Sequence, residues 1–461
     1  MKGARRILCT IALCAVGFTF AAGPVRATVF NPVRLTFNTN DDYYPWIDGN
    51  KIVWQGFDNW DYEIYCYDTQ TGETTEISHN LFGDFHPIVD GDYVLWTHVE
   101  GDDAYLLLHD LESGETVQLS QGDYTTIGRF EGDNGTLIDG GLVTWREQRQ
   151  VFLYDASTGE TIQITDNDEG NRFPTVSQGR VAWTSTDSGN TRKVYLYDVT
   201  TGETEEIYSS PDFLSEVKIS GDHLAWRQYM GADPGPIWDI FVHDVSTGET
   251  RRITGTDKYN NLHAVAEQGV AWTAWGGTGS FDGVFFYDFA TGETNLVVDG
   301  SEQTADRLYA KGSDLVWQGT HLLGVDVFHY DILTGEVTRV SRGIVTDEYP
   351  TADSGRVVWQ AYDVTSGHYE IFLGIPSPGS ECFIATAAFG SSLEPRVACL
   401  REFRDRVLMR SRPGRILVDA YYVYSPPVAA LISEHPALRR IVRTALAPVV
   451  GLAEVILELS R

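Results

Sequence analysis

The repeat unit of this chain is clearest in residues 48–78, which read DGNKIVWQGFDNWDYEIYCYDTQTGETTEIS. Alternating apolar and polar residues predict short, half-buried strands around Trp54 and from Ile64 to Asp68. The Asp68 carboxylate can accept hydrogen bonds from backbone N–H groups two or three residues later. Gly72 supplies the positive φ that the following turn needs. The stretch is therefore predicted to be part of a four-stranded unit.

The sequence features of this unit recur along residues 32–375. An apolar or small residue precedes a tryptophan in every unit, and these tryptophans are Trp54, Trp96, Trp145, Trp183, Trp226, Trp272, Trp317 and Trp359. The strand-ending aspartate recurs every 42 to 46 residues, at Asp68, Asp110, Asp155, Asp198, Asp244, Asp288 and Asp331. This period is typical of a β-propeller blade. A four-stranded sheet cannot bury both faces alone, so we expect the blades to stack in a ring.

The tryptophans predict an all-β, eight-bladed propeller, with seven blades as the alternative because the unit of Trp145 has a short second hairpin. The last unit, residues 347–375, reaches only its third strand. Residues 32–37 read like a missing fourth strand, so the N-terminal strand is predicted to close the ring. Closure of this kind removes free sheet edges.

The repeat from Asp48-Gly49 through Trp54 and Ile64–Asp68 to Gly72-Glu73 resembles the TolB-like propeller repeats of exported bacterial proteins and archaeal surface proteins. The resemblance covers residues 32–375 and implies the propeller fold. It implies little about activity, because propellers serve in binding, scaffolding and catalysis alike.

The chain ends carry different signals. Residues 1–27 have a basic start, an apolar run of about 16 residues and a small-residue site ending at Ala27, which predicts a signal peptide. The net charge of −31 argues against nucleic acid as a partner. The predicted mature chain keeps Cys66, Cys382 and Cys399, so at least one thiol is not paired within it.

Residues 376–381 read as a linker, and residues 382–461 as a small helical module. Cys382-Phe383-Ile384 through Gly390, with Leu400–Asp405 and Ser425-Pro426-Pro427, resembles a bacterial C-terminal module named for its Cys-Phe-Ile box. Three interpretations stay open: Cys382 as a processing or attachment point, helices lying on a membrane surface, or a plain helical bundle. Charged residues interrupt every apolar run, which argues against a membrane span.

Enzyme motifs are scarce. The sequence has no Gly-x-Ser-x-Gly elbow, no His-Glu-x-x-His and no zinc-type Cys/His spacing. One stretch, residues 185–192, resembles a sialidase Asp-box with Arg192 in place of the aromatic residue, but it occurs only once.

A more regular pattern lies twelve residues before the tryptophans. The side chains there carry oxygen atoms in six units: Asp42, Asp84, Asp133, Asn171, Asn260 and Asp347. Leu214 and Ala305 break the pattern. We expect these side chains to ring one mouth of the central channel. They are candidates for a Ca²⁺ or cationic-ligand site, and the competing interpretation is capping of a turn that recurs with the blade.

The sequence thus predicts an exported, non-enzymatic binding or scaffold protein of the periplasm, cell surface or exterior. Its partner is expected to be a protein or a glycan. The C-terminal module is expected to serve in sorting, anchoring or docking. The alternative is a glycan-active or other hydrolase or lyase with its site at one channel mouth. Clustered titratable groups there would favour the enzyme, and repeated aspartates alone would favour the scaffold.

Overall fold

The computed structural model describes residues 29–122, 137–231, 236–255, 258–276, 279–301, 303–321, 324–341 and 346–377. It also describes single residues and short groups between 388 and 453, all of them helical. Up to Ser377 the described secondary structure consists of β-strands.

The strands form six four-stranded sheets and one eight-stranded sheet. The first three, in chain order, contain β2 (Asp42–Asp48), β3 (Lys51–Phe57), β4 (Tyr62–Asp68) and β5 (Glu73–Glu76); β6 (Gly83–Asp90), β7 (Tyr93–Glu100), β8 (Asp103–Asp110) and β9 (Thr116–Gln118); β10 (Ile138–Asp139), β11 (Leu142–Glu147), β12 (Gln150–Asp155) and β13 (Glu160–Gln163). The fourth contains β14 (Arg172–Ser177), β15 (Arg180–Thr186), β16 (Arg192–Asp198) and β17 (Glu203–Ser210).

The eight-stranded sheet contains β18 (Leu214–Ser220), β19 (His223–Gly231), β20 (Ile237–Asp244), β21 (Glu249–Arg252), β22 (Tyr259–Ala266), β23 (Gly269–Trp275), β24 (Phe281–Asp288) and β25 (Thr294–Asp299). The last two sheets contain β26 (Thr304–Lys311), β27 (Asp314–His321), β28 (Gly324–Asp331) and β29 (Glu336–Arg339); β30 (Asp347–Asp353), β31 (Arg356–Asp363), β32 (His368–Ser377) and β1 (Val29–Arg34).

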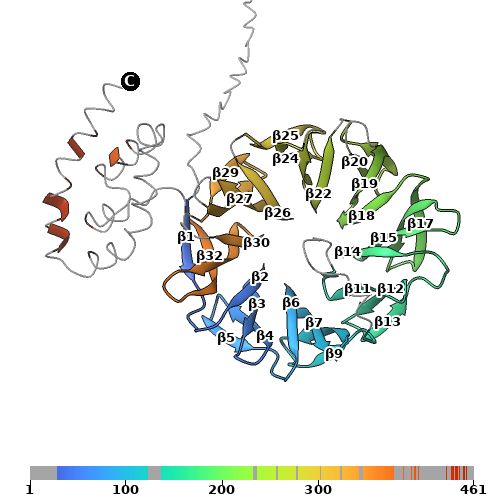
Figure 1. Ribbon diagram of the computed structural model, residues 1–461, viewed down its shortest axis with the longest axis horizontal. Coiled ribbons are helices and arrows are strands. Elements are labelled where there is room, and N and C mark those ends of the chain that lie inside the picture. Colours follow the sequence, from blue (N-terminus) through green and yellow to red (C-terminus); the bar gives the residue numbers. More distant parts are fainter. Residues whose placement is uncertain are drawn as a thin grey trace, which may run out of the picture.

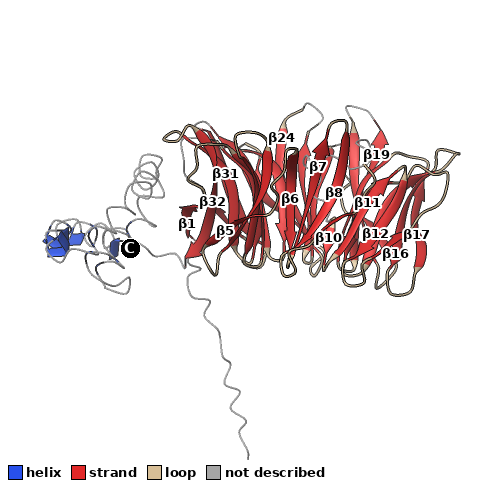
Figure 2. Ribbon diagram, turned by 90° about the horizontal axis from the view of Figure 1, so that it is seen from below, coloured by secondary structure: helices blue, strands red, loops and turns tan. Residues whose placement is uncertain are grey.

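The sheets are arranged radially around a central opening, as in a β-propeller (Figure 1). Strands β2, β6, β14, β18, β22, β26 and β30 lie innermost, and the edge-on view shows a disc (Figure 2). The predicted all-β propeller is confirmed. One parallel pair, Trp238 with Tyr259, joins the two halves of the eight-stranded sheet. The number of blades, eight, therefore stays a prediction, although the strands group in fours throughout.

The N-terminal strand completes the last sheet, as predicted. Strand β1 pairs antiparallel with β32, from Val29 opposite Ser377 to Arg34 opposite Phe372. The strand begins three residues before the predicted Pro32 and ends at Arg34, although Leu35 N still donates to Ile371 O at 2.8 Å. The ends of the propeller chain thus pair with each other, which leaves no unpaired edge at the seam.

The core lies between successive blades and is built around the repeated tryptophans. Trp54 stacks on Tyr65 of the neighbouring strand, with ring centroids 5.9 Å apart and 16° between the ring planes. The same stacking recurs for Trp145 with Phe152, Trp183 with Tyr195, Trp226 with Phe241, Trp272 with Phe285, Trp317 with Phe328 and Trp359 with Phe372. All eight tryptophans are at most 3% exposed. Burial of such large aromatic side chains contributes to the stability of the fold.

The predicted turn chemistry is also confirmed. Asp68 Oδ1 accepts the backbone N–H of Gln70 at 2.7 Å, and Gly72 N donates to the Asp68 carbonyl at 2.8 Å. Gly72 has a φ of +75°, a conformation that favours glycine. Much of the acidity of this chain thus belongs to turns that recur with the blade.

Candidate functional site

The predicted ring of oxygen-bearing side chains is buried inside the blades. In four units the side-chain Oδ1 accepts a hydrogen bond from the indole Nε1 of the tryptophan twelve residues later: Asp42 from Trp54 at 3.1 Å, Asp84 from Trp96 at 2.8 Å, Asn171 from Trp183 at 3.2 Å and Asp347 from Trp359 at 3.1 Å. These four side chains and Asn260 are at most 3% exposed, and Asp133 lies outside the described residues. The expectation that they line the open channel mouth is wrong for the five described members.

Some of these side chains also take part in hydrogen bonds that connect one blade to the next, and Asp84 is an example. Ser78 Oγ donates to Glu63 Oε2 at 2.5 Å and accepts the Ile64 N–H at 2.8 Å. Asn80, two residues on, donates from its backbone N–H to Glu63 Oε1 and from Nδ2 to Asp84 Oδ2, both at 2.7 Å. A chain of hydrogen bonds thus runs from β4 of one blade to β6 of the next.

This arrangement recurs, and we call it the inter-blade latch. Its members are Glu63, Ser78, Asn80 and Asp84; Gln150, Thr165, Asn167 and Asn171; and Glu370, Thr36, Asn38 and Asp42. The hydrogen bonds between hydroxyl and acceptor are 2.7 Å long in the second and third sets. A role that recurs with the fold is explained by the fold. The sequence predicted that these side chains cap the backbone of the entry turn. In four units they instead accept a hydrogen bond from a tryptophan indole. The Ca²⁺ site stays a prediction.

The two units that lack this side chain leave their tryptophan without an acceptor. Leu214 and Ala305 occupy the position, and Nε1 of Trp226 and of Trp317 has no hydrogen-bond partner among the described residues. A buried donor left unpaired costs about 1–3 kcal/mol.

We therefore expect Ala305→Asn to be more stable than Ala305→Leu by about 1 kcal/mol, because only asparagine offers Trp317 an acceptor. The two replacements are close in size, so the comparison separates hydrogen bonding from packing. Chemical denaturation of both variants measures the difference. Equal or higher stability of the leucine variant would contradict the role assigned to the latch.

Two positions after the recurring site the backbone is left-handed in five units. Tyr44, His86, Phe173, Arg307 and Tyr349 occupy this position, and all five have a φ between +53° and +55°. The Tyr44 ring contacts Tyr349 and His86, with centroids 4.6 and 4.7 Å apart, so these rings touch from blade to blade. A left-handed backbone at bulky residues is costly and marks places where side-chain direction matters.

A polar pocket of about 250 Å³ is lined by three successive innermost strands, β18, β22 and β26, and by β19; β18 and β26 are the two strands in which Leu214 and Ala305 break the repeat. We call it the mouth pocket; its lining residues are Glu216 of β18, Arg227 of β19, Asn261, Leu262 and His263 of β22, and Asp306 and Arg307 of β26. Sequence reasoning missed these residues. The available signal was the break in the pattern itself, at Leu214 and Ala305.

Hydrogen bonds hold the side chains of the mouth pocket in place. The Arg227 guanidinium lies 3.0 Å from Glu216 Oε1 and donates to Asn261 Oδ1 at 2.5 Å. Its Cζ is 5.2 Å from the centre of the Trp238 ring. His263 Nε2 lies 2.8 Å from Thr273 Oγ1 and 3.1 Å from Asn261 Nδ2. The pocket is therefore preorganised.

Burial sets the charge states in this pocket. Burial raises the pKa of Glu216, but the positive charges of Arg227 and Lys218 outweigh it and hold that pKa below its usual value. Burial lowers the pKa of His263 to about 4. At neutral pH the pocket thus presents a carboxylate and a neutral imidazole. The Arg307 guanidinium lies over Tyr349 at 4.5 Å and forms no ion pair with any residue that the structure describes.

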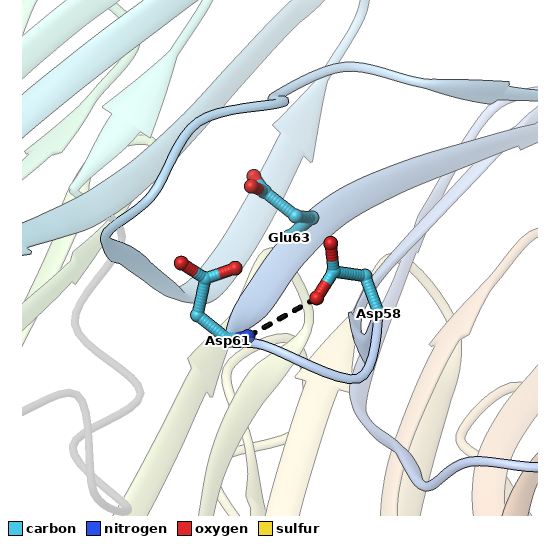
Figure 3. A group of neighbouring side chains, drawn as sticks. All are labelled: Asp58, Asp61 and Glu63. Carbon is cyan, nitrogen blue, oxygen red and sulfur yellow. Dashed lines mark hydrogen bonds between the residues drawn. The ribbon is translucent and has the colours of Figure 1, made fainter.

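A separate acidic group lies in the first blade, where Asp58, Asp61 and Glu63 bring one carboxylate oxygen each within 4.8 Å of the others (Figure 3). Asp58 Oδ1 accepts the backbone N–H of Asp61 at 3.1 Å. Burial raises the pKa of Glu63 to about 7, and its two oxygens accept hydrogen bonds from Ser78 Oγ and Asn80 N. Glu63 is therefore already a latch residue, which leaves two carboxylates for a cation.

The cysteines differ in environment. Cys66 is buried in the core, which raises the pKa of its thiol to about 11 and keeps it protonated at neutral pH. Cys399 is partly exposed, and Cys382 lies outside the described residues. No helix in the described part of the chain is long and apolar enough to span a bilayer.

Comparison with known proteins finds likeness in structure alone. No family model and no curated protein matches the chain. The oligogalacturonate lyase in complex with manganese is 13% identical, with a TM-score of 0.46, over 76% of this chain and 97% of that one. The propeller domain of the Trilobed protease from Pyrococcus furiosus is 13% identical (TM-score 0.47; 73% and 97% covered). Porphyromonas gingivalis dipeptidyl peptidase 4 is 11% identical (TM-score 0.48; 73% and 59% covered). These likenesses concern the propeller fold.

Proposed function

We propose that this protein is an exported binding protein whose propeller recognises a glycan at the mouth pocket. One observation carries the proposal: polar side chains from β18, β19, β22 and β26 converge on one pocket, and two of these strands, β18 and β26, are those in which the repeat departs from its pattern. A small, preorganised pocket with a few convergent polar groups is the usual form of a ligand site.

The chemistry of the pocket favours a sugar. Arg227 and Arg307 supply hydrogen-bond donors, Glu216 and Asp306 supply acceptors, and Asn261 supplies both. Hydroxyl groups on neighbouring sugar carbons need such alternating donors and acceptors. Trp238 and Tyr349, which lie against the two arginines, add aromatic rings of the kind on which the C–H face of a sugar can stack.

Titration calorimetry on the mature chain, after a glycan array has selected ligands, tests this proposal. We expect Arg307→Ala to weaken glycan binding by about tenfold or more, because it removes a charged donor that no described carboxylate holds. Arg180→Ala is the matched control, since Arg180 pairs with Asp222 and does not line the mouth pocket. The absence of glycan binding, or equal loss in the control, would rule the proposal out.

Glycan cleavage at the same pocket is a second candidate function. The observation that favours it is His263, a neutral imidazole at neutral pH, held by Thr273 next to the carboxylate of Glu216. Such an imidazole can accept a proton from a substrate. If the protein cleaves glycans, His263→Asn should abolish product formation while glycan binding persists. The rate should fall as the pH drops below about 4, when the imidazole becomes protonated.

The C-terminal module is proposed to direct or anchor the exported protein, with Cys382 as the processing or attachment point. The predicted linker 376–381 begins two residues too early, because Pro376 and Ser377 belong to β32 and pair with β1. A linker in the remaining residues would separate the module from the propeller, which supports a role of its own. Deletion of residues 381–461 followed by fractionation tests this. If the truncated protein is found in the same fraction as the full chain, the proposed role in sorting or anchoring is wrong. If it moves to another fraction while the propeller stays folded, the role is supported.

A further inference from the structure

A second pocket, of about 370 Å³, lies on the face of the blade that contains β14 and β15. We call it the arginine pocket, because Arg149, Arg172 and Arg192 all line it. None of the three forms an ion pair with a residue in the described part of the chain. Arg149 and Arg192 donate only to the backbone carbonyls of Asp168 and Asn190. Two carboxylates, Asp168 and Asp187, also line the pocket, and Asp187 lies 3.7 Å from Lys193 Nζ. In a chain of net charge −31, three arginines that form no ion pair with them around one pocket are a feature that needs a cause.

The backbone holds this pocket open in a defined form. Arg149 has a φ of +70° and Phe173 a φ of +53°, and both side chains line the pocket. Asp187 Oδ1 accepts the N–H groups of Gly189 and Thr191 at 2.8 and 2.9 Å, which fixes the β15–β16 turn. This turn is the stretch that resembles an Asp-box, and in this fold it places Arg192 at the pocket.

Aromatic rings connect the arginine pocket with the mouth pocket. The Arg192 Cζ lies 5.5 Å from the centre of the Phe213 ring. Phe213 contacts Trp238, with ring centroids 5.8 Å apart and planes at 90°. Trp238 in turn lies 5.2 Å from Arg227 Cζ in the mouth pocket. Two rings, Phe213 and Trp238, thus lie in series between Arg192 of one pocket and Arg227 of the other, and Phe213 is 44% exposed.

We propose that the arginine pocket binds the carboxylate groups of an acidic oligosaccharide whose other end occupies the mouth pocket. This inference rests on the proposed glycan-binding function. Guanidinium groups bind carboxylates with paired hydrogen bonds, and exposed rings such as Phe173 and Phe213 can support the sugar faces between them. Hydroxyl and amide groups from Thr184, Ser188 and Asn190 in the pocket wall favour a hydroxyl-bearing chain over an acidic peptide.

Calorimetry with a uronic-acid disaccharide and hexasaccharide, the carboxyl-reduced hexasaccharide and a polyglutamate peptide tests the inference. For the wild-type mature chain we expect the acidic hexasaccharide to bind at least about tenfold more tightly than the disaccharide and the reduced hexasaccharide. The double variant Arg172→Ala, Arg192→Ala should lose this advantage but still bind the disaccharide. Arg180→Ala serves again as the control.

The outcomes separate the two proposals. Equal binding of the acidic and reduced hexasaccharides, or an unchanged hexasaccharide affinity in the double variant, would overturn the inference and leave the mouth pocket standing. Tighter binding of polyglutamate would overturn the choice of a glycan. Binding that depends on Arg172 and Arg192 but not on Arg307 would overturn the proposed site at the mouth pocket instead. Circular dichroism of each variant checks that the propeller is folded.

Discussion

Asp84→Ala is expected to lower the free energy of unfolding by about 3 kcal/mol, the largest effect of a single replacement in the latch. Asp84 is fully buried, and its carboxylate accepts hydrogen bonds from Trp96 Nε1, His98 Nδ1 and Asn80 Nδ2 at 2.7–2.8 Å. Alanine would leave these donors without their acceptor in a place that water reaches poorly. Each unpaired buried donor costs about 1–3 kcal/mol, and relaxation of the side chains recovers a part of that cost.

Two further variants make this test specific. Asp84→Asn keeps an acceptor for Trp96 and should cost no more than about half as much, as Asn171 already fills the same position against Trp183. Asp102→Ala removes an exposed aspartate and should change stability by less than about 0.5 kcal/mol. Denaturant midpoints compare all three. If Asp84→Ala were as stable as Asp102→Ala, the latch would not contribute to the free energy of unfolding.

The propeller is expected to be more stable near pH 5.5 than near pH 8. Burial raises the pKa of Asp42 and that of Asp347 to about 7, whereas an aspartate in the unfolded chain has a pKa of about 3.9. Between these values the folded state holds more protons than the unfolded state. The free energy of unfolding therefore falls as the pH rises from about 4 to about 7 and stays low above that. Thermal unfolding at both pH values should show a difference of roughly 5 °C.

The double variant Asp42→Asn, Asp347→Asn isolates the source of this dependence. Asparagine keeps an acceptor for Trp54 and Trp359 but cannot ionise, so the variant should gain stability at pH 8 and lose most of the pH dependence. Asn171 shows the arrangement in the protein itself, with Nδ2 donating to Asn167 at 3.0 Å. A pH profile unchanged by the double replacement would show that other groups, such as Glu63, cause the dependence.

The sequence correctly singled out Asp42, Asp84 and Asp347 as a recurring set, but the predicted role at the channel mouth is wrong. In the structure these side chains accept hydrogen bonds from tryptophan indoles. Their recurrence twelve residues before a tryptophan is visible in the sequence, and so is their association with the entry to a blade. Their acceptor role is not visible, because the donor sits on the adjacent strand and only the antiparallel register brings the two together. Two residues later the backbone is left-handed at Tyr44 and Arg307, and Arg307 lines the mouth pocket.

The sequence by itself determined the propeller, because strands, turns and stacked tryptophans follow from patterns within a span of about 43 residues that repeat. It also determined closure by the N-terminal strand, since the last unit lacks its fourth strand. Only the tertiary structure decided the mouth pocket. Glu216, Arg227, His263 and Asp306 come from three units, and no local pattern relates them. They meet because the ring places the innermost strands of successive blades side by side, and that long-range packing has no signature in any one repeat.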